Sequence, residues 1–266
     1  MNAIRPVGEL IRDWRQRRRL TQLDLAAMAD TSTRHVSFIE TGRSLPSRAM
    51  LMRLAERLEV PLRERNVLMT AAGLAPVYGQ RAFDDPALQQ ARAAIDMVLT
   101  GHEPYPAVAV DRHWNLVAAN RALAPMLAGA APHLLEPPVN ILRLSLHPEG
   151  VAPRIVNFGE IRAHLLQRLR HQADSTGDPE LRELYDELSA YPMPPGSVPH
   201  ADPDWQPAKS VAMQLQLRTE AGVLSFITTV TVFGTPTDVT LSELAIESFF
   251  PADAATADAL RGMPLG

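Results

Sequence analysis

The sequence predicts two domains: an all-α domain of five short helices, followed by an α+β domain with a five-stranded antiparallel sheet. Residues 1–75 contain five successive segments in which apolar residues recur at helical spacing. That spacing is lost in the turn-rich stretch Gly73–Pro86. Beyond it, two segments alternate as β-strands do, and a group of helical segments follows them. Three further strand-like segments come after the helices. We therefore expect a helical domain at 1–74, a linker at 75–84 and the α+β domain at 85–266.

Composition excludes several classes of protein. The 266 residues are 46% hydrophobic and 21% charged, which is typical of a soluble globular chain. No apolar run reaches the roughly 18 residues of a membrane span, and charged residues come too early at the N-terminus for a secretory signal. The absence of cysteine removes disulfides, thiol catalysis and thiolate metal sites. The expectation is a cytoplasmic protein with no membrane partner.

Charge is distributed unevenly along the chain. Residues 1–75 carry 13 arginines against 8 acidic residues, whereas residues 76–266 carry 13 basic and 22 acidic residues. A basic first domain on an acidic body favours a polyanion as the partner of that domain. A solvated, arginine-rich surface explains the same charge about equally well, so both interpretations stay open.

The five helices of the first domain are marked by caps and stops. Thr21 and Asp24 form a T-x-x-D capping box, and Ser32 is a candidate N-cap. Pro6 suits the first turn of a helix, and Gly42 suits a left-handed stop. The predicted helices run over residues 6–17, 21–29, 32–42, 47–58 and 62–72.

The third predicted helix has two different faces. Val36 and Ile39 form a narrow inner stripe, and so short a helix must be held by its neighbours. The outward side carries short hydroxyl side chains together with Arg34 and Phe38. Arginine can pair with guanine, hydroxyls can bond base edges or phosphate, and a phenylalanine can touch a thymine methyl, so this face suits a major groove. For Phe38, packing against the next helix is an equally good interpretation.

Two motifs in this region are L-T-Q-x-x-L-A, from Leu20, and I-E-x-G-R-x-x-P, from Ile39. They resemble the helix-turn-helix of the phage-repressor-like XRE regulators, over roughly residues 7–72. The resemblance implies binding to a double-stranded DNA operator. The candidate DNA-binding residues are Thr21, Gln22, Ser32, Thr33, Arg34, Ser37, Phe38 and Arg43.

The same resemblance has two structural implications. Asp30 stands where the family commonly has a glycine in the turn, and aspartate tolerates the left-handed conformation that the turn needs. Glu40 is implied to pair with Arg15 of the first helix, since an unpaired buried carboxylate would be costly.

The second domain is expected to begin with a helix over 86–99 and a β-hairpin over 107–120 with its bend at Asp111–His113. Asn140 is a candidate cap for a short helix, and Asn157 with Glu160 forms a candidate N-x-x-E capping box for a longer one. One more helix starts at Asp178-Pro179. The segment 191–207 has too many prolines for a helix or central strand and is expected to be a loop. The last three strands are predicted within 210–219, 223–234 and 238–250.

Three segments of this domain are DRHWNLVAANRA, NILRLSLHPEG and FGTPTDVTLSELAIESFFPAD. They resemble the MmyB-like ligand-binding domain that follows such a helix-turn-helix in many bacterial regulators, over residues 84–262. The resemblance implies a PAS-like fold with a pocket for a fatty-acyl or similar apolar ligand between sheet and helices. No other cofactor is expected. The periodicity allows such a cavity, although a filled core explains it without a further assumption.

The expected polar anchor for such a ligand is Arg143 or His147, with Arg154 as a second choice. An arginine between leucines either reaches water or meets an anion such as a carboxylate head group. Trp114, Asn115 and Asn120 could close the mouth of the pocket, although a helix-capping role suffices for Asn120. The candidate ligand-binding residues are Trp114, Asn115, Arg143, His147, Arg154, Phe158, Leu165, Leu166, Leu169, Phe226 and Thr228.

Enzyme functions find little support. The sequence lacks the H-E-x-x-H, nucleophile-elbow and glycine-rich phosphate-loop motifs. The only lysine, Lys209, adjoins Ser210 in a predicted strand, where adjacent side chains point to opposite faces, so no Ser–Lys dyad is expected. His200 and Asp202 offer two metal ligands without a third nearby. The acid pairs are interpreted as a helix start, at Asp84-Asp85, and as a solvated strand, at Glu243 and Glu247.

Together these observations predict a homodimeric transcription regulator, most often a repressor in such families, that is controlled by a small apolar or acyl effector. Two alternatives stay open. In the first, the protein binds DNA and its second domain only dimerises. In the second, the helical domain is a scaffold and the protein is a ligand-binding or assembly module without DNA.

Overall fold

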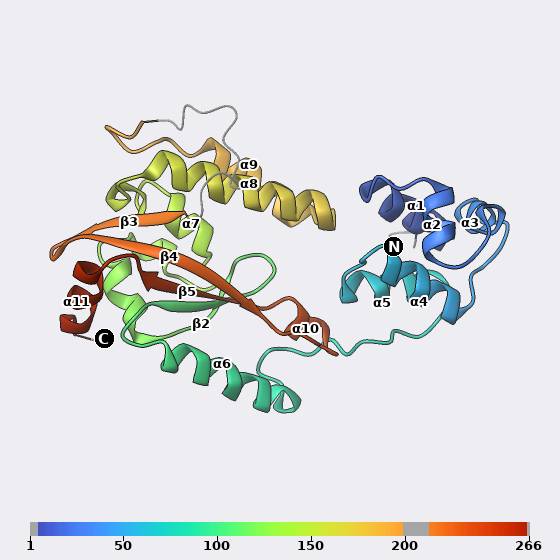
Figure 1. Ribbon diagram of the computed structural model, residues 1–266, viewed down its shortest axis with the longest axis horizontal. Coiled ribbons are helices and arrows are strands. Elements are labelled where there is room, and N and C mark those ends of the chain that lie inside the picture. The colour runs from blue at the N-terminus through green and yellow to red at the C-terminus, as the bar shows by residue number, and fades with distance from the viewer. Residues whose placement is uncertain (1–4, 199–212, 265–266) are drawn as a thin grey trace. The chain divides into compact units, whose positions relative to one another are not determined.

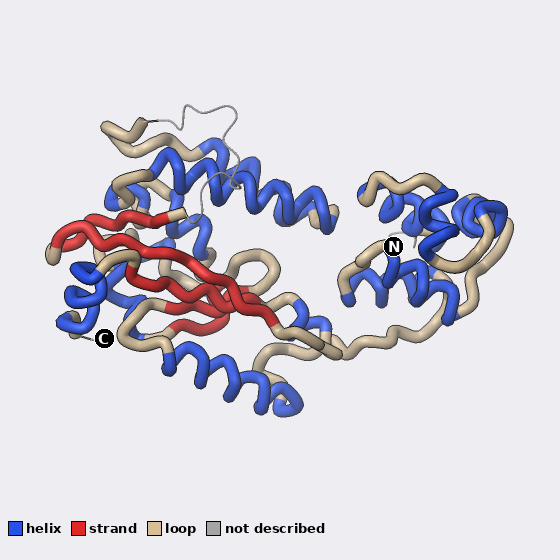
Figure 2. Tube along the Cα trace, viewed as in Figure 1, coloured by secondary structure: helices blue, strands red, loops and turns tan. Residues whose placement is uncertain are grey.

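The computed structural model describes residues 5–198 and 213–264. They form two compact units: the first holds the residues up to Ala82 with Asp174–Thr176 and Thr235–Ser242, and the second holds the rest. The first unit is helical, and the second combines a sheet with helices (Figure 1, Figure 2). The predicted fold class, an all-α domain followed by an α+β domain with a five-stranded antiparallel sheet, is confirmed.

The first unit begins with five helices. Their bounds are α1 Val7–Arg17, α2 Gln22–Met28, α3 Thr33–Glu40, α4 Arg48–Arg57 and α5 Leu62–Ala71. The predicted capping box is confirmed, because the Asp24 backbone N–H donates to Thr21 Oγ1 and the Thr21 backbone N–H donates to the Asp24 carboxylate. The turn between α2 and α3 holds Asp30 at φ 50°, the left-handed conformation expected of it.

Helix α1 approaches α3 very closely at Gly8. A Cβ atom at Gly8 would lie 2.1 Å from the backbone oxygen of Ile39. Any larger residue would therefore push the two helices apart. Val36 and Ile39 of α3 are fully buried against this support, as the inner stripe predicts. The short α3 helix is thus stabilised by packing rather than by its own length.

The predicted linker is bound to its surroundings within the first unit. The side chain of Asn66 on α5 accepts hydrogen bonds from the backbone N–H groups of Val77 and Tyr78, at 2.9 and 3.0 Å. Arg81 donates to the carboxylate of Asp238 at 2.7 Å, just before the short helix α10, Val239–Ser242. These bonds give an aperiodic segment a defined path.

The second unit is built on one antiparallel sheet. Its strands are β1 Ala107–Val110, β2 Leu116–Ala119, β3 Gln214–Thr219, β4 Gly222–Val232 and β5 Ala245–Pro251. The order across the sheet is β2-β1-β5-β4-β3, so the first hairpin pairs with the last strand. The predicted hairpin with its bend at Asp111–His113 is confirmed.

Helices cover both faces of this sheet (Figure 1). In Figure 1, α8 and α9 lie on one side of the sheet and α6 on the other. The main apolar core of the unit includes Phe158 and Leu169 of α8 with Leu217 and Phe226 of the sheet. The helical elements are η1 Pro86–Leu88, α6 Gln89–Gly101, η2 Arg121–Leu127, η3 Pro132–Leu134, α7 Ile141–Leu146, η4 Ala152–Arg154, α8 Phe158–Thr176, α9 Pro179–Ala190 and α11 Ala254–Gly262. None of the described helices is both long and apolar enough to cross a membrane.

Several features of the described residues differ from the sequence prediction. The last strand begins at Ala245 rather than near 238, because Asp238 accepts the backbone N–H of Thr240 and starts helix α10. Asn157 does not form the predicted capping box. Its side chain instead bonds β3, accepting from the Gln216 N–H and donating to the Gln214 carbonyl. Helix α11, capped by Asp253, was not predicted.

The proline-rich segment predicted as a loop is described as far as Val198, and it contains no helix or strand up to that point. The remaining part of that segment, with His200 and Asp202, lies outside the described residues. The pair Lys209-Ser210 lies outside them as well.

Candidate functional site

A buried ionic network joins α1, α2 and α3. The Glu40 side chain is fully buried and accepts hydrogen bonds from Arg15 Nε at 2.7 Å, Arg15 Nη2 at 2.9 Å and Gln22 Nε2 at 2.8 Å. Arg12 Nη2 also donates to the Glu40 backbone oxygen at 3.1 Å. The predicted pairing of Glu40 with Arg15 is confirmed. This network fixes α3 on the two helices that precede it.

The network also keeps Glu40 ionised. Burial by itself raises the pKa of Glu40, but the hydrogen bonds from Arg15 and Gln22 and the positive charges of Arg15 and Arg12 outweigh it. The net pKa of Glu40 is therefore lower than its usual value.

The opposite face of α3 carries an uncompensated positive patch. Arg34 and Arg43 are exposed, and both guanidinium groups lie over the half-buried ring of Phe38, at 5.1 and 5.8 Å from its centroid. Within residues 5–198 and 213–264 neither arginine forms an ion pair. Thr33 is exposed beside them and Ser37 is half-buried. The two cations are thus free to meet phosphates or base edges.

The remaining candidate DNA contacts have local partners. Thr21 and Ser32 are exposed N-caps, and Ser32 Oγ accepts the backbone N–H of His35. Gln22, another candidate DNA contact, donates one N–H of its amide to Glu40. Its amide oxygen and the second N–H of its amide nitrogen are left for another partner.

The second unit contains a cavity of about 430 Å³ between the sheet and helices α7 and α8. This volume falls within the roughly 300–1,000 Å³ of typical small-molecule sites. Its lining is mostly apolar and comes from α7, α8, β3, β4 and β5. The lining residues are Ile141, Leu142, Ser145, Val151, Ile155, Ile161, His164, Leu165, Arg168, Met213, Leu215, Ile227, Thr228, Glu247 and Phe249.

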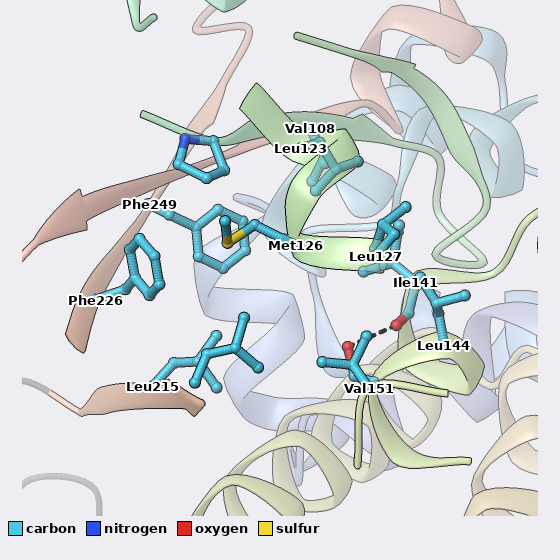
Figure 3. A pocket seen from close by; sticks show the side chains of 13 residues that line it. Val108, Leu123, Met126, Leu127, Ile141, Leu144, Val151, Leu215, Phe226 and Phe249 are labelled. Carbon is cyan, nitrogen blue, oxygen red and sulfur yellow. Dashed lines mark hydrogen bonds between the residues drawn. The ribbon is translucent and has the colours of Figure 1, made fainter. Parts of the chain in front are cut away.

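A smaller apolar cavity of about 80 Å³ adjoins the first. Figure 3 shows Leu215, Phe226 and Phe249 of the sheet on one side of it and Leu127, Ile141 and Leu144 on the other. Five residues line both cavities: Ile141, Ser145, Val151, Leu215 and Phe249. The smaller cavity is therefore an apolar extension of the larger one.

The larger cavity has one polar end, formed by Arg168, Glu247 and His164. Arg168 Nη1 donates to Glu247 Oε1 at 2.5 Å, and the Glu247 side chain is only 8% exposed. The Arg168 guanidinium also stacks on the ring of Trp114, 4.3 Å from its centroid. Burial lowers the pKa of His164, and the nearby charge of Arg168 lowers it further.

The sequence candidates for the ligand site divide into three groups. Leu165 and Thr228 line the larger cavity, and Phe226 lines the smaller one. Three apolar candidates, Phe158, Leu166 and Leu169, belong to the packed core and line neither cavity. The other candidates, Trp114, Asn115, Arg143, His147 and Arg154, also lie outside both cavity walls.

The predicted anchor Arg143 has a protein partner in the structure. Its guanidinium makes a two-pronged contact with Glu187 of α9, at 2.7 and 2.8 Å, so its charge is already compensated. Tyr191 donates to the same carboxylate, and burial together with that hydrogen bond raises the pKa of Tyr191 to about 12. His147 packs edge-on against Tyr191. This cluster ties α7 to α9 rather than facing a ligand.

The other polar candidates also have structural roles. Arg154 donates to the backbone oxygens of Met126, Ala128 and Arg218. Asn115 bonds the Asp111 carboxylate in the hairpin bend. Trp114 has an unusual left-handed φ of 68° and donates from Nε1 to Gln172, which fixes the ring on which Arg168 stacks.

Asn120 is structural, as predicted, but not as a helix cap. It makes no side-chain capping bond. Its Oδ1 accepts the Ala107 N–H, and its Nδ2 donates to the carbonyls of Leu99 and Tyr105. Asn120 thus joins the end of α6 to the start of β1.

Among the described residues, one group can be tested as a metal site. The candidate ligand atoms of His133, His147 and Glu149 lie within 4.8 Å of one another. However, the Glu149 backbone N–H donates to His147 Nδ1, which places the proton of the neutral ring on Nε2. Neither nitrogen of His147 then offers a lone pair, and we assign no metal to this group.

The polar end of the cavity was missed in the sequence, although a signal was present. Glu247 was interpreted as solvated from its spacing to Glu243, but it is buried and faces the cavity. In a strand it shares a face with Ala245 and Phe249, two residues away on either side. Arg168 lies three residues after Leu165, on the same helix face. The interpretation of Asp85 as a helix start is confirmed, since it caps η1.

Comparison with protein families agrees with a helical domain followed by an α+β domain. Residues 11–65 match a helix-turn-helix family model. Residues 91–263 match the model of the MmyB-like transcription regulator ligand binding domain. No curated protein matches the chain. Neither matched family is a family of enzymes.

The match to the ligand-binding domain covers more than half of the chain, and the helix-turn-helix precedes it as the motifs predict. The first unit supplies an exposed positive face on α3, and the second supplies a largely apolar cavity with one polar end. The chain therefore belongs to the MmyB-like transcription regulators, as a DNA-binding regulator of the XRE type with a C-terminal ligand-binding domain.

Proposed function

We propose that this protein is a dimeric repressor. Its affinity for its operator is controlled by an acyl effector that binds in the cavity of the second unit. The main support for DNA binding is the outward face of α3. There Arg34 and Arg43 flank Phe38 without acidic partners in the described chain. In contrast, Arg12 and Arg15 of α1 bind Glu40 on the inner side of α3. Arg34 and Arg43 are therefore suited to contacting DNA.

The mode of binding follows from the helix-turn-helix. The N-terminal part of α3 enters the major groove, where Arg34 and Thr33 reach base edges, while Arg43 and the cap residues Thr21 and Ser32 meet phosphates. A two-fold dimer would place two such helices about 34 Å apart on one face of the duplex. The operator is then an inverted repeat with half-sites one helical turn apart.

Replacing Arg34 with alanine tests this proposal. A base contact by arginine contributes about 1–3 kcal/mol of discrimination, so we expect roughly a 5- to 150-fold loss of preference for the operator over random DNA. The fold should be retained because the Arg34 side chain is exposed. Titration of labelled upstream DNA at two salt concentrations measures both site preference and the electrostatic contribution.

Arg57→Ala is the matched control, because it removes a positive charge from an exposed position on α4 rather than from α3. It should weaken binding to all sequences slightly and leave the preference unchanged. If both variants lost operator preference equally, Arg34 would contribute only its positive charge and would not read a base. A wild-type protein without salt-sensitive binding to its own upstream DNA would end the repressor proposal and favour a module that works without DNA.

The acyl effector is supported by the cavity, whose volume and apolar lining suit a hydrocarbon chain. Substituting Leu165→Trp should fill the cavity, since Leu165 is a half-buried wall residue on α8. Mass spectrometry of organic extracts from the denatured protein should find an acyl compound in the wild type and at least about tenfold less in the variant, equal to a loss of roughly 1.4 kcal/mol.

Met97→Trp is the control for this experiment, because Met97 is 72% exposed on α6 and lines neither cavity. Its extract should match that of the wild type. Repeated extracts without any acyl compound would favour the alternative in which the second domain only dimerises.

A further inference from the structure

The polar end of the cavity holds a charged residue on a largely apolar sheet face. Glu247 stands directly opposite Val108 on β1 and Val230 on β4, so all three side chains point to the cavity side of the sheet. Its side chain is 8% exposed, and Arg168 is its only side-chain partner among the described residues. Burying a carboxylate is costly unless it is paired and hydrogen-bonded, and among the described residues Arg168 supplies one such bond.

One oxygen of Glu247 is left for a ligand. The bond from Arg168 Nη1 occupies Oε1, and Oε2 has no hydrogen-bond partner within residues 5–198 and 213–264. Oε2 is also not among the completely occluded polar atoms that lack partners. A cavity-lining carboxylate oxygen of this kind accepts a hydrogen bond from an O–H or N–H group and repels a second anion.

Arg168 is held in place but keeps donor capacity. The ring of Trp114 supports its guanidinium from one side, and Glu247 binds one of its five N–H groups. Its side chain is 33% exposed. The unused N–H groups can therefore donate to a carbonyl oxygen of a ligand at the same end of the cavity.

The charges at this end cancel. Arg168 and Glu247 neutralise each other, and the lowered pKa of His164 keeps that imidazole neutral near pH 7. The other polar lining groups, Ser145 and Thr228, are uncharged hydroxyls. The cavity thus offers an acceptor and a donor side by side without a net positive charge.

We propose that the cavity selects a neutral acyl ligand whose head group carries both a hydrogen-bond donor for Glu247 and a carbonyl oxygen for Arg168. Acyl amides and acyl esters with a free hydroxyl have this chemistry. The inference rests on the proposed function, since it concerns the same effector cavity. It names the class of effector that the repressor proposal leaves open.

A free fatty acid is disfavoured by this arrangement. Its carboxylate must either share Arg168 with Glu247 or lie close to Glu247 without compensation. Two carboxylates in one poorly solvated site raise the cost of keeping both ionised. A neutral amide avoids that repulsion and gains a hydrogen bond to a charged acceptor, a bond that contributes about twice as much as one between neutral groups.

Four probes with the same acyl chain test the proposal: dodecanamide, dodecanoic acid, methyl dodecanoate and monododecanoylglycerol. Calorimetric titration of delipidated full-length protein at about pH 8, where a carboxylic acid is ionised, measures the four affinities. The amide and the glycerol ester should bind at least about tenfold more tightly than the acid. The methyl ester lacks a donor and should also bind more weakly than the amide.

Glu247→Gln separates charge from shape. Glutamine can still accept the hydrogen bond from Arg168, but it removes the negative charge and leaves Arg168 to bind an anion. We expect the ratio of amide affinity to acid affinity to fall by about tenfold or more, so that the acid is preferred. Glu187→Gln is the matched control, because it breaks the Arg143–Glu187 pair outside both cavities and should leave the ratio unchanged.

Each outcome decides a different claim. If no probe binds, both this inference and the acyl-effector proposal fail. If the wild type binds the acid as tightly as the amide, the inference fails while the acyl effector stands. If Glu247→Gln weakens acid and amide equally, Glu247 only positions Arg168, and the inference fails again. The comparison of amide with methyl ester in the wild type remains decisive should the variant not fold.

Discussion

Replacing Glu40 with glutamine is expected to lower the free energy of unfolding of the first unit by about 3 kcal/mol or more, the usual cost of removing one partner from a buried ion pair. The Glu40 carboxylate is fully buried and receives two hydrogen bonds from Arg15 and one from Gln22. Without it, the guanidinium of Arg15, which is only 11% exposed, keeps a charge that has lost its partner.

The effect should be concentrated in helices α1, α2 and α3, because Glu40 bonds side chains from the two preceding helices. Hydrogen exchange of the full-length protein, read peptide by peptide, measures the free energy of local opening in each helix. Asp13→Asn is the control, since the Arg5–Asp13 pair is exposed and should contribute less than about 1 kcal/mol. Equal destabilisation by both substitutions would contradict the special role of the buried network.

The same network gives the first unit a dependence on pH. The folded-state pKa of Glu40 is depressed below its usual value, so the stabilisation is present above the unfolded-state pKa and is lost as pH falls through the folded-state value. Acid unfolding of the wild type should therefore include a step that Glu40→Gln lacks. As the pH rises from the folded-state pKa of Glu40 to about 5, the wild type should gain stability from this carboxylate, and the variant should lack that gain.

Replacing Asn120 with alanine is expected to lower the free energy of unfolding of the second unit by about 3 kcal/mol. Three hydrogen bonds are lost. The Ala107 N–H and the Tyr105 carbonyl lose their side-chain partner, at about 1–3 kcal/mol per group before water or relaxation compensates, whereas the Leu99 carbonyl keeps the bond from the His102 N–H. Because β1 lies between β2 and β5, loosening its start should reach the cavity wall at Val108.

Urea unfolding of the full-length protein, followed by exchange at β1 peptides, measures this effect. Arg121→Ala is a neighbouring control: it breaks an ion pair with Glu103 in which the arginine side chain is 63% exposed. That loss should stay below about 1 kcal/mol. If Asn120→Ala were as mild as the control, the three bonds would have to be replaced by water in the variant.

Much of the fold was predictable because local rules decide it. Thr21 with Asp24 and the left-handed Asp30 mark α2 and its turn through contacts within a few residues. The capping pattern gave a wrong prediction where a distant strand competed for the hydrogen bonds of the capping side chain. Asn157 precedes a helix with Glu160 in the right place, yet its side chain bonds β3, which lies far along the chain. The spacing of residues within one segment cannot reveal a hydrogen-bond partner that lies far along the chain.

The sites divide in the same way. The sequence by itself determined the two-domain order, the inward stripe of α3 and its outward arginine and hydroxyl face, because these follow from periodicity within one helix. The partner of Arg143 and the neighbours of Glu247 were decided only by the tertiary structure. Arginine and glutamate look alike in a sequence whether they meet solvent, a ligand or each other. Which of these they meet depends on strand register and helix packing over many residues, and here that packing turned the expected anchor into a structural pair and placed Arg168 with Glu247 in the cavity.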